Sequence, residues 1–294
     1  MTKTYQRLFK FFRISFILIL LICLVMEFYC RKPDEFKVRA LSLPSETEMA
    51  VLLFHGARDH LNPEVSAIAK KFTKLLITRS NTEVINYDWS FAANNRLRAS
   101  ANAIEVGKIL GRELAMMDQL KHLRIIAHSG GAFVPDELCR TYRNAGGMAY
   151  IEITFLDPFG LRGFLDRGFG VRSHGSCADF ALSIVNTDDP APTTNSILKN
   201  AWNLDVTGLP RPTDFIYRKD LRTVDTDFWL GVGETLDDVK RNLNNPEQQH
   251  NGHYWPPYYF LTILDEKMAQ PAERQHQQFP RGSVIDAPPV LIAE

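Results

Sequence analysis

The stretch LRIIAHSGGAFV, residues 123–134, contains a serine in a setting that suits a nucleophile. Its first residues form a short, β-branched apolar run typical of a buried strand, and this run ends abruptly at His-Ser-Gly-Gly. A nucleophilic serine at a strand end needs a sharp turn into a helix, with small residues beside it. Ala127 and Gly131 are small, and Gly130 gives the backbone extra freedom. The alternative is a plain Gly-Gly turn in which Ser129 has no chemical role.

A reactive serine requires a base further along the chain. Because its hydroxyl is a weak nucleophile at neutral pH, a histidine must take the proton, and a carboxylate must fix the tautomer of that histidine. Histidines follow Ser129 at positions 174, 250, 253 and 276. His253 is the predicted base, because Gly252 and two prolines place it in a defined loop before an aromatic, apolar stretch. His250, three residues earlier, is its competitor.

Two acidic sites end predicted strands after the serine. Asp157 lies in TFLDPFG, and Asp188 lies in IVNTDDP beside a second aspartate. The proline after Asp157 restricts the turn that carries its carboxylate. Asp188 precedes a proline-rich loop, a context more typical of an exposed or capping residue. We therefore expect Asp157 to be the acid and retain Asp188 as the alternative.

Acyl transfer also needs two backbone N–H groups that bind the oxyanion. The first is predicted at Gly130, directly after the serine and at the N-terminus of a helix, where free N–H groups point outward. The second is predicted in the loop after FHG, at Ala57. His55 is interpreted as a packing or hydrogen-bonding residue. This chemistry requires no cofactor and no metal ion, and none is predicted.

Predicted strands and helices alternate along the chain. Apolar patterns indicate strands at 49–54, 82–89, 123–126, 151–157 and 179–188, and helices at 63–77 and 99–117. This alternation predicts an α/β fold with a mostly parallel, doubly wound sheet and helices on both faces. In such sheets the chemistry collects at the carboxyl ends of the strands, where Ser129, Asp157 and Asp188 all fall. Residues 189–212 are rich in Pro, Thr and Asn and are expected to form a long loop.

Composition limits the classes of protein and partner. With 294 residues, 45% of them hydrophobic, the chain can bury a full core as one domain. Its formal net charge is zero, which gives no reason to expect a nucleic acid partner. Cys139 and Cys177 lie in the expected soluble body and permit one disulfide there, although their spacing does not say whether they pair.

The first 34 residues differ from the rest of the chain. Basic residues precede the apolar run Ile14 to Met26, which Glu27 ends. As a helix this run would span roughly 20 Å, less than the ~30 Å hydrocarbon core of a bilayer. That length suits a signal peptide, but no small-residue cleavage site follows, so a cleaved signal and an uncleaved anchor both stay open. Both place the following body outside the cytoplasm. A buried amphipathic helix is the third interpretation.

These observations predict three regions. Residues 1–34 form the signal or anchor, residues 35–268 form the α/β domain, and residues 269–294 form an extended tail rich in Gln and Pro.

Six short segments between residues 50 and 260 each resemble a segment of one known protein family, and they occur in the same order. They are LLFHGARD, VINYDWS, SANAIEVGKIL, IIAHSGGAF, FLDPFG and ADFALSIVNTDD. In this order the chain resembles the pancreatic-lipase-type α/β hydrolases. The resemblance implies the α/β-hydrolase fold, a serine lipase or esterase activity, and an acid at Asp157. The sequence departs from that family at Ala127, Gly130 and Asn186, and Pro135 falls in the second turn of the helix after the serine, where it removes a backbone donor.

The sequence thus predicts a serine carboxyl-ester hydrolase, secreted or membrane-anchored, that cleaves acyl esters such as lipids. Its membrane contact is expected through the N-terminal segment. The alternative is a non-catalytic hydrolase-fold protein that binds an acyl or hydrophobic ligand, which the altered serine turn and Pro135 favour. The order of Ser129, Asp157 and His253 along the chain favours the enzyme, although the same triad also suits acyl transfer or peptide cleavage.

Overall fold

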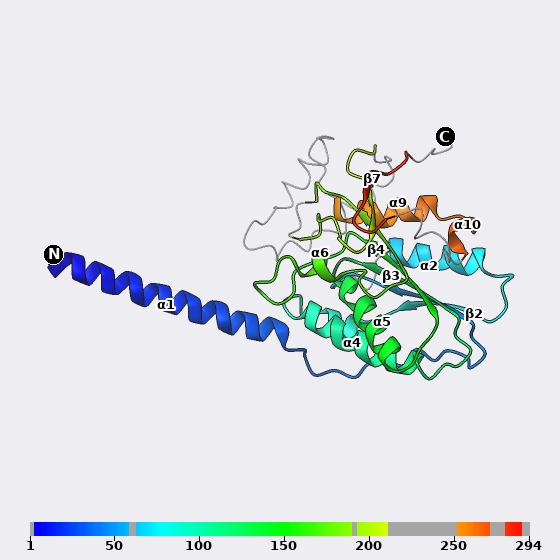
Figure 1. Cartoon of the computed structure of the whole chain (residues 1–294), viewed down its shortest axis with the longest axis horizontal. Helices are drawn as coiled ribbons and strands as arrows, with labels where there is room; N and C mark the ends of the chain where they lie inside the picture. Colours follow the sequence, from blue (N-terminus) through cyan, green and yellow to red (C-terminus); the bar gives the residue numbers. More distant parts are fainter. Residues whose placement is uncertain (1–2, 59–62, 190–192, 211–251, 271–279, 290–294) are drawn as a thin grey trace.

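Strands and helices alternate through most of the described chain (Figure 1). A computed structural model describes residues 3–58, 63–189, 193–210, 252–270 and 280–289. Its strands are β1 (Met49–Phe54), β2 (Thr82–Tyr87), β3 (His122–His128), β4 (Tyr150–Leu156), β5 (Phe180–Val185), β6 (Trp202–Asp205) and β7 (Val284–Asp286). Its α-helices are α1 (Lys3–Arg31), α2 (Pro63–Leu75), α3 (Ser90–Ala93), α4 (Ala99–Leu114), α5 (Phe133–Asn144), α6 (Phe169–Ser173), α9 (Trp255–Ile263) and α10 (Glu266–Ala269). Two 3₁₀ turns, η1 (Ser129–Ala132) and η3 (Gly252–Tyr254), complete the described elements.

The described strands form one seven-stranded sheet in the order β2-β1-β3-β4-β5-β6-β7. Every neighbouring pair is parallel, which confirms the α/β architecture expected from the alternation of strands and helices. The chain leaves β1 toward β2 on one side and then continues from β3 in the opposite direction. The order therefore reverses between β1 and β3. Ligands of open α/β sheets bind outside the carboxyl ends of the strands at such a reversal.

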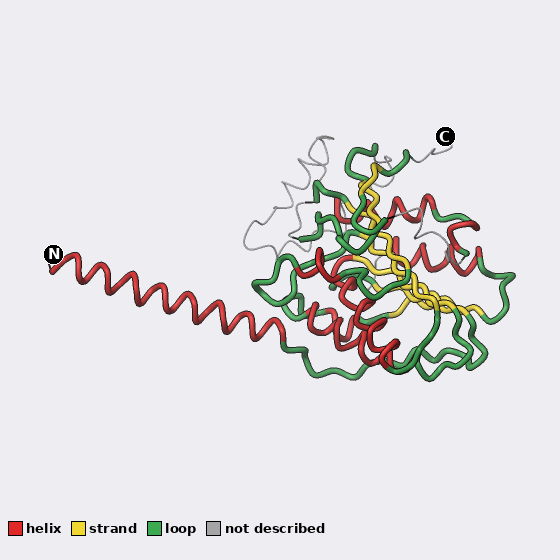
Figure 2. The backbone as a smooth tube through the Cα atoms, viewed as in Figure 1, coloured by secondary structure: helices red, strands yellow, loops and turns green. Residues whose placement is uncertain are grey.

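Helices cover both faces of this sheet, as expected. Leu52 and Phe54 of β1 join a buried cluster with side chains of α4 and α5, whereas Val51 and Leu53 join a second cluster with α2 and α9. This division follows from the strand itself, because successive side chains point to opposite faces. Figure 2 shows the strands twisting between the two groups of helices.

The helix after β3 begins later than the sequence suggests. The turn η1 intervenes, so α5 starts at Phe133 and Pro135 lies in its first turn. The prediction that Pro135 occupies the second turn is therefore wrong. In a first turn the backbone N–H groups have no acceptor within the helix, so a proline there removes no helical hydrogen bond.

Two strands were not expected from the sequence. The predicted loop 189–212 contains β6, and the predicted tail contains β7, which extends the sheet beside β6. β6 has only four residues, and its buried Asn203 side chain donates to the carbonyl oxygens of Leu198 and Ala201. Because local hydrogen bonds support this strand in place of a long apolar run, its sequence does not have the usual strand pattern.

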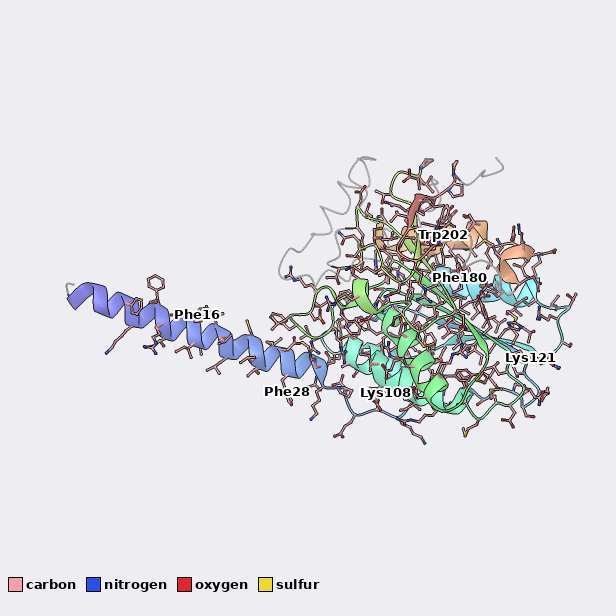
Figure 3. All side chains as sticks on the ribbon, viewed as in Figure 1. Phe16, Phe28, Lys108, Lys121, Phe180 and Trp202 are labelled. Atoms are coloured by element: carbon pink, nitrogen blue, oxygen red, sulfur yellow. A yellow bond between two sulfur atoms is a disulfide. The ribbon has the colours of Figure 1, made fainter. Side chains whose placement is uncertain are left out.

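Helix α1 is longer than the apolar run on which the sequence prediction was based. Aromatic residues extend the run at both ends, so that Phe9–Arg31 is a 23-residue stretch that contains an 18-residue window of mean hydropathy 2.5. No part of its most apolar window is buried in the protein, and Phe16 projects from the part of α1 that stands clear of the domain (Figure 3). A buried amphipathic helix is thus excluded. At about 1.5 Å per residue, α1 is long and apolar enough to be a signal or a membrane anchor.

Cys139 and Cys177 form a disulfide that joins α5 to the segment before β5. The buried carboxylate of Asp136 holds the same segment, because it accepts the backbone N–H groups of Gly175 at 2.8 Å and Cys177 at 3.1 Å. The sequence left open whether Cys139 and Cys177 pair, and the structure shows that they do. The disulfide fixes the end of the β4–β5 loop that lies next to β5.

Candidate active site

Ser129 follows β3 directly and has a strained backbone conformation. Its φ of 50° falls in the left-handed region, which residues with side chains seldom adopt. The serine is half-buried, whereas His128 and Gly130 on either side of it are buried. A strained, partly accessible serine between a strand and a helical turn has the geometry of a nucleophile elbow.

Close approach of two loops explains the glycines after Ser129. A Cβ atom on Gly131 would lie 2.6 Å from the carbonyl oxygen of His55, so a larger residue there would push β1 away. A Cβ atom on Gly130 would lie 3.1 Å from the Cβ atom of Ala57 and 3.2 Å from its backbone nitrogen. The loop after β1 therefore lies against the turn after β3, as the pairing of these two strands requires.

The two residues predicted to bind the oxyanion lie next to each other. Within the described part of the chain, neither the N–H group of Ala57 nor that of Gly130 donates a hydrogen bond, whereas the next N–H group along, that of Arg58, donates to Ala93. Two adjacent donors beside a serine, one of them at the start of a helical turn, can stabilise a developing negative charge.

His253 and Asp157 meet although 96 positions separate them in sequence. His253 lies in η3, and its Nδ1 atom is 2.7 Å from Oδ2 of Asp157, which directly follows β4. Asp157 is fully buried, and its Oδ1 atom accepts the N–H group of Asn186 at 3.0 Å. A carboxylate held in this way keeps a proton on Nδ1 of His253, which leaves Nε2 available to act as a base.

Ser129 and His253 are linked indirectly, by a ring contact and by hydrogen bonds of the residues next to them. The ring of His128 lies 4.7 Å from that of His253, centroid to centroid, and its Nε2 atom donates to the His253 carbonyl oxygen at 3.2 Å. The carbonyl oxygen of Ser129 accepts the N–H group of Phe159, two residues after Asp157. Among the described residues there is no hydrogen bond between the Ser129 hydroxyl and His253, a bond that often tightens only when substrate is bound.

A second carboxylate contacts the same histidine nitrogen. Oδ2 of Asp189 lies 2.9 Å from Nδ1 of His253, and the Thr194 hydroxyl donates to the same oxygen. The alternative acid Asp188 is exposed instead. β5 ends at Val185, and a turn closed by the Asp189 N–H group and the Asn186 carbonyl oxygen follows it. That turn directs Asp189 inward, so the Asn-Thr-Asp-Asp-Pro turn was the signal that could have identified Asp189.

The other histidines considered from the sequence take different places. His174 is buried beside Asp136, with its Nε2 atom 3.0 Å from the carbonyl oxygen of Phe159, and belongs to the support of the β4–β5 loop. His55 bonds to the Gly56 carbonyl oxygen through Nδ1 and accepts the Trp89 N–H group through Nε2. The competing base His250, like the tail residue His276, lies outside the described residues.

The three titratable groups shift one another's pKa values. Complete burial raises the pKa of Asp157 well above its usual range, and the hydrogen bond to His253 offsets only part of this rise. Burial also acts to raise the pKa of Asp189, but hydrogen bonds from His253, Asp157 and Thr194 outweigh it and lower that pKa. Burial alone would lower the pKa of His253, whereas the hydrogen bonds and charges of both carboxyl groups raise it to about 10. Both carboxyl groups therefore favour the protonated form of His253.

The same side chains form the group of possible metal ligands found among the described residues. One nitrogen of His253 and one oxygen each from Asp157 and Asp189 lie within 4.8 Å of one another. One imidazole and two carboxylates are a donor set that zinc or iron accepts. A metal at this position would take the Nδ1 atom that otherwise donates to the carboxylates, so metal binding and triad chemistry exclude each other here.

No protein-family model matches the chain, and a comparison with curated proteins finds no similar sequence. Geometry alone therefore indicates which chemistry the site can perform.

Proposed function

We propose that the protein is a serine carboxyl-ester hydrolase with an α/β-hydrolase fold, in which Ser129 is the nucleophile and His253 the base. The observation that carries this proposal is the strained serine after β3, with two unbonded N–H groups beside it. Strain of this kind persists only where the surrounding structure holds it, and it concentrates at functional sites. The Asp157–His253 pair on the loops after β4 and before α9 supports the same assignment.

In the proposed reaction the Ser129 hydroxyl oxygen attacks the carbonyl carbon of an acyl ester, and Nε2 of His253 takes the hydroxyl proton. The negative charge that forms on the carbonyl oxygen is bound by the N–H groups of Ala57 and Gly130. The intermediate expels the alcohol, which receives the proton from His253, and an acyl group remains on Ser129. Water then attacks this acyl-enzyme with the same histidine as base, releasing the carboxylic acid and free Ser129.

A non-catalytic protein that binds an acyl ligand is the second candidate. The observation that favours it is the missing hydrogen bond between Ser129 and His253 in the described residues. Two of the sequence arguments for it have weakened, because Pro135 lies in a first turn and Ala127 is fully buried between strands.

A fluorophosphonate probe together with a panel of p-nitrophenyl esters tests the proposal. We expect the probe to label the full chain on Ser129 and the esters to turn over, with no loss of either after treatment with EDTA. A chain that binds the esters without labelling or turnover is the second candidate. Activity that disappears with EDTA and returns with zinc would instead assign Asp157, Asp189 and His253 to a metal.

The pH dependence of turnover follows from the charge beside His253. The base must be neutral, and a pKa of about 10 keeps it protonated at neutral pH. We expect kcat/KM for a water-soluble ester to rise with pH up to about 10. Asp189→Asn removes one negative charge from Nδ1, so it should lower the pKa of His253 and move this rise to lower pH. The exposed neighbour provides the control, since Asp188→Asn should leave the profile unchanged. Identical profiles for the two variants would contradict the assignment of Asp189.

The location that fits these features is the extracytoplasmic side of a membrane. α1 has the length and composition of a signal or an anchor, with basic residues in its first half. The Cys139–Cys177 disulfide persists in oxidising compartments and not in the cytosol.

A reporter enzyme that needs an oxidising compartment tests this location. Fused after Ala40, it should be active, whereas the same fusion to a chain lacking α1 should be inactive. Alkylation of the denatured full chain without reductant should modify Cys23 and Cys30 and leave Cys139 and Cys177 unmodified. Modification of all these cysteines before reduction would place the domain in the cytosol.

A further inference from the structure

We propose that the turn Gly163–Leu165 is a membrane-docking surface, whose Phe164 and Leu165 side chains enter the outer leaflet of the bilayer that α1 spans. The reaction site would then receive acyl esters that reside in that leaflet. The docking rests on the contacts below, whereas the statement about substrate also rests on the proposed hydrolase function.

A carboxylate near the end of α1 holds this turn. The backbone N–H groups of Phe164 and Leu165 both donate to Oε2 of Glu27, at 2.7 and 2.9 Å. Arg31 pairs with the same carboxylate from one helical turn further on. A Cβ atom on Gly163, where φ is +70°, would lie 2.7 Å from Glu27, so the turn is in direct contact with the helix. Any membrane that α1 crosses must end close to this contact.

A second contact fixes the direction in which α1 leaves the domain. The guanidinium group of Arg98 lies 3.8 Å from the centroid of the Tyr29 ring, and it also bonds to Asp34 at 2.7 Å. The Asp34 N–H group donates to Asn102 of α4 at 2.7 Å, and Cys30 is buried. Because α1 is attached to the domain at two separate places, the same face of the domain always meets the membrane. A signal that is removed would gain nothing from these contacts, so they favour an anchor that stays.

The turn presents apolar side chains on a rigid support. Phe164 is 42% exposed and Leu165 is 54% exposed, although both are attached by their backbone. The turn is closed by the hydrogen bond from Arg162 N–H to the Asp166 carbonyl oxygen. The exposed basic side chains of Arg167, two residues after the turn, and of Lys32, directly after α1, suit anionic headgroups. Apolar side chains with a basic border are typical of surfaces that lie in a membrane interface.

The turn is also continuous with the candidate active site. It belongs to the segment that starts at Asp157, and the Phe159 N–H group donates to the carbonyl oxygen of Ser129 at 3.1 Å. Phe164 lies seven positions after Asp157, which limits the distance between their Cα atoms to about 25 Å even in a fully extended chain. Figure 1 shows α6, which follows the turn, on the side of the domain from which α1 leaves. The turn and the candidate active site therefore belong to one short segment of the chain.

Depth-dependent quenching tests the docking directly. The full chain, carrying Cys23→Ala and Cys30→Ala, is reconstituted in phosphatidylcholine vesicles, and bimane is attached through Phe164→Cys or Leu165→Cys. Lipids with a doxyl group near the headgroup should quench both probes and shift their emission to shorter wavelength. Probes at Ile77 and Met148, which are 79% and 86% exposed, provide matched controls and should stay unquenched. Glu27→Ala should weaken the quenching at Phe164.

Equal quenching at Phe164 and Met148 would overturn the proposal. The proposal would also be overturned if the mature chain recovered from membranes lacked α1, because the contact between Glu27 and the turn would then be lost.

Kinetics test the statement about substrate. Phe164→Ser with Leu165→Ser should lower turnover of a vesicle-resident ester on the order of tenfold for each apolar side chain lost. Turnover of a water-soluble ester should stay unchanged, and Met148→Ser should affect neither. Loss on both substrates would mean that the turn supports the fold and not docking. A wild-type chain that is quenched as expected but cleaves no ester would refute the proposed function and leave the docking intact.

Discussion

Replacing Ser129 by alanine is expected to abolish fluorophosphonate labelling and to lower ester turnover by roughly 10⁶-fold, the loss typical of removing a triad nucleophile. The described turn that Ser129 begins offers no second hydroxyl to take over, since its other residues are glycines and alanine. Labelling of the purified full chain, followed by mass analysis of the labelled peptide, measures this directly.

The matched control is Ser66→Ala, which removes another half-buried serine hydroxyl, on α2, from a place far from the site in sequence. That variant should label and turn over like the unchanged protein. If Ser129→Ala is labelled as strongly as Ser66→Ala, the nucleophile lies elsewhere and the proposed mechanism falls.

The strain at Ser129 gives the same assignment a readout that does not depend on activity. Glycine adopts a φ of 50° without penalty, so Ser129→Gly should raise the free energy of unfolding by about 1 kcal/mol while it removes activity. Ser66→Gly, inside a helix, should lower the free energy of unfolding by a similar amount. If the free energy of unfolding changes in opposite directions at the two positions, the backbone conformation of Ser129 serves the chemistry and not the stability of the fold.

The sequence located the parts of the site that depend on strand ends. Strand β1 has the predicted bounds, and β3 ends where the serine turn was expected, because apolar runs bounded by small or polar residues mark buried parallel strands well. The closeness of Ala57 and Gly130 then follows from the pairing of β1 with β3.

What the sequence missed depends on tertiary contacts. Asp189 reaches His253 only because a turn after β5 rotates it inward, while Asp188, its neighbour, is turned outward. β6 and β7 form by pairing with strands already in place, and neither has the apolar run that marks a strand by itself. The contact between Glu27 and the Phe164 turn joins residues 137 positions apart, which no local pattern can indicate.

The two carboxyl groups on His253 lead to the second large prediction. Either one alone should be able to hold the proton on Nδ1, because both lie within 3 Å of it. Asp157→Asn leaves Oδ2 of Asp189 at 2.9 Å from the same nitrogen. Asp189→Asn leaves Oδ2 of Asp157 at 2.7 Å from the same nitrogen. Each single variant should therefore lose only about tenfold in kcat/KM, a smaller loss than a triad with one acid shows.

Removing both carboxylates is expected to lower kcat/KM by about 10⁴-fold, because His253 then has no charged partner and adopts the wrong tautomer. If the two single losses were independent, the double variant would lose only about a hundredfold in kcat/KM. The further loss of about a hundredfold corresponds to a coupling energy of about 2.7 kcal/mol between the two acids, which act through one nitrogen. Asp188→Asn, combined with either single variant, should add nothing, since that side chain is exposed. A full loss in Asp157→Asn alone, with Asp189→Asn active, would make Asp157 the single acid; the reverse ranking would move that role to Asp189. Only a small loss in each single variant and a large loss in the double variant fits a histidine held by two carboxylates, because a charge is needed at Nδ1 and either loop can supply it.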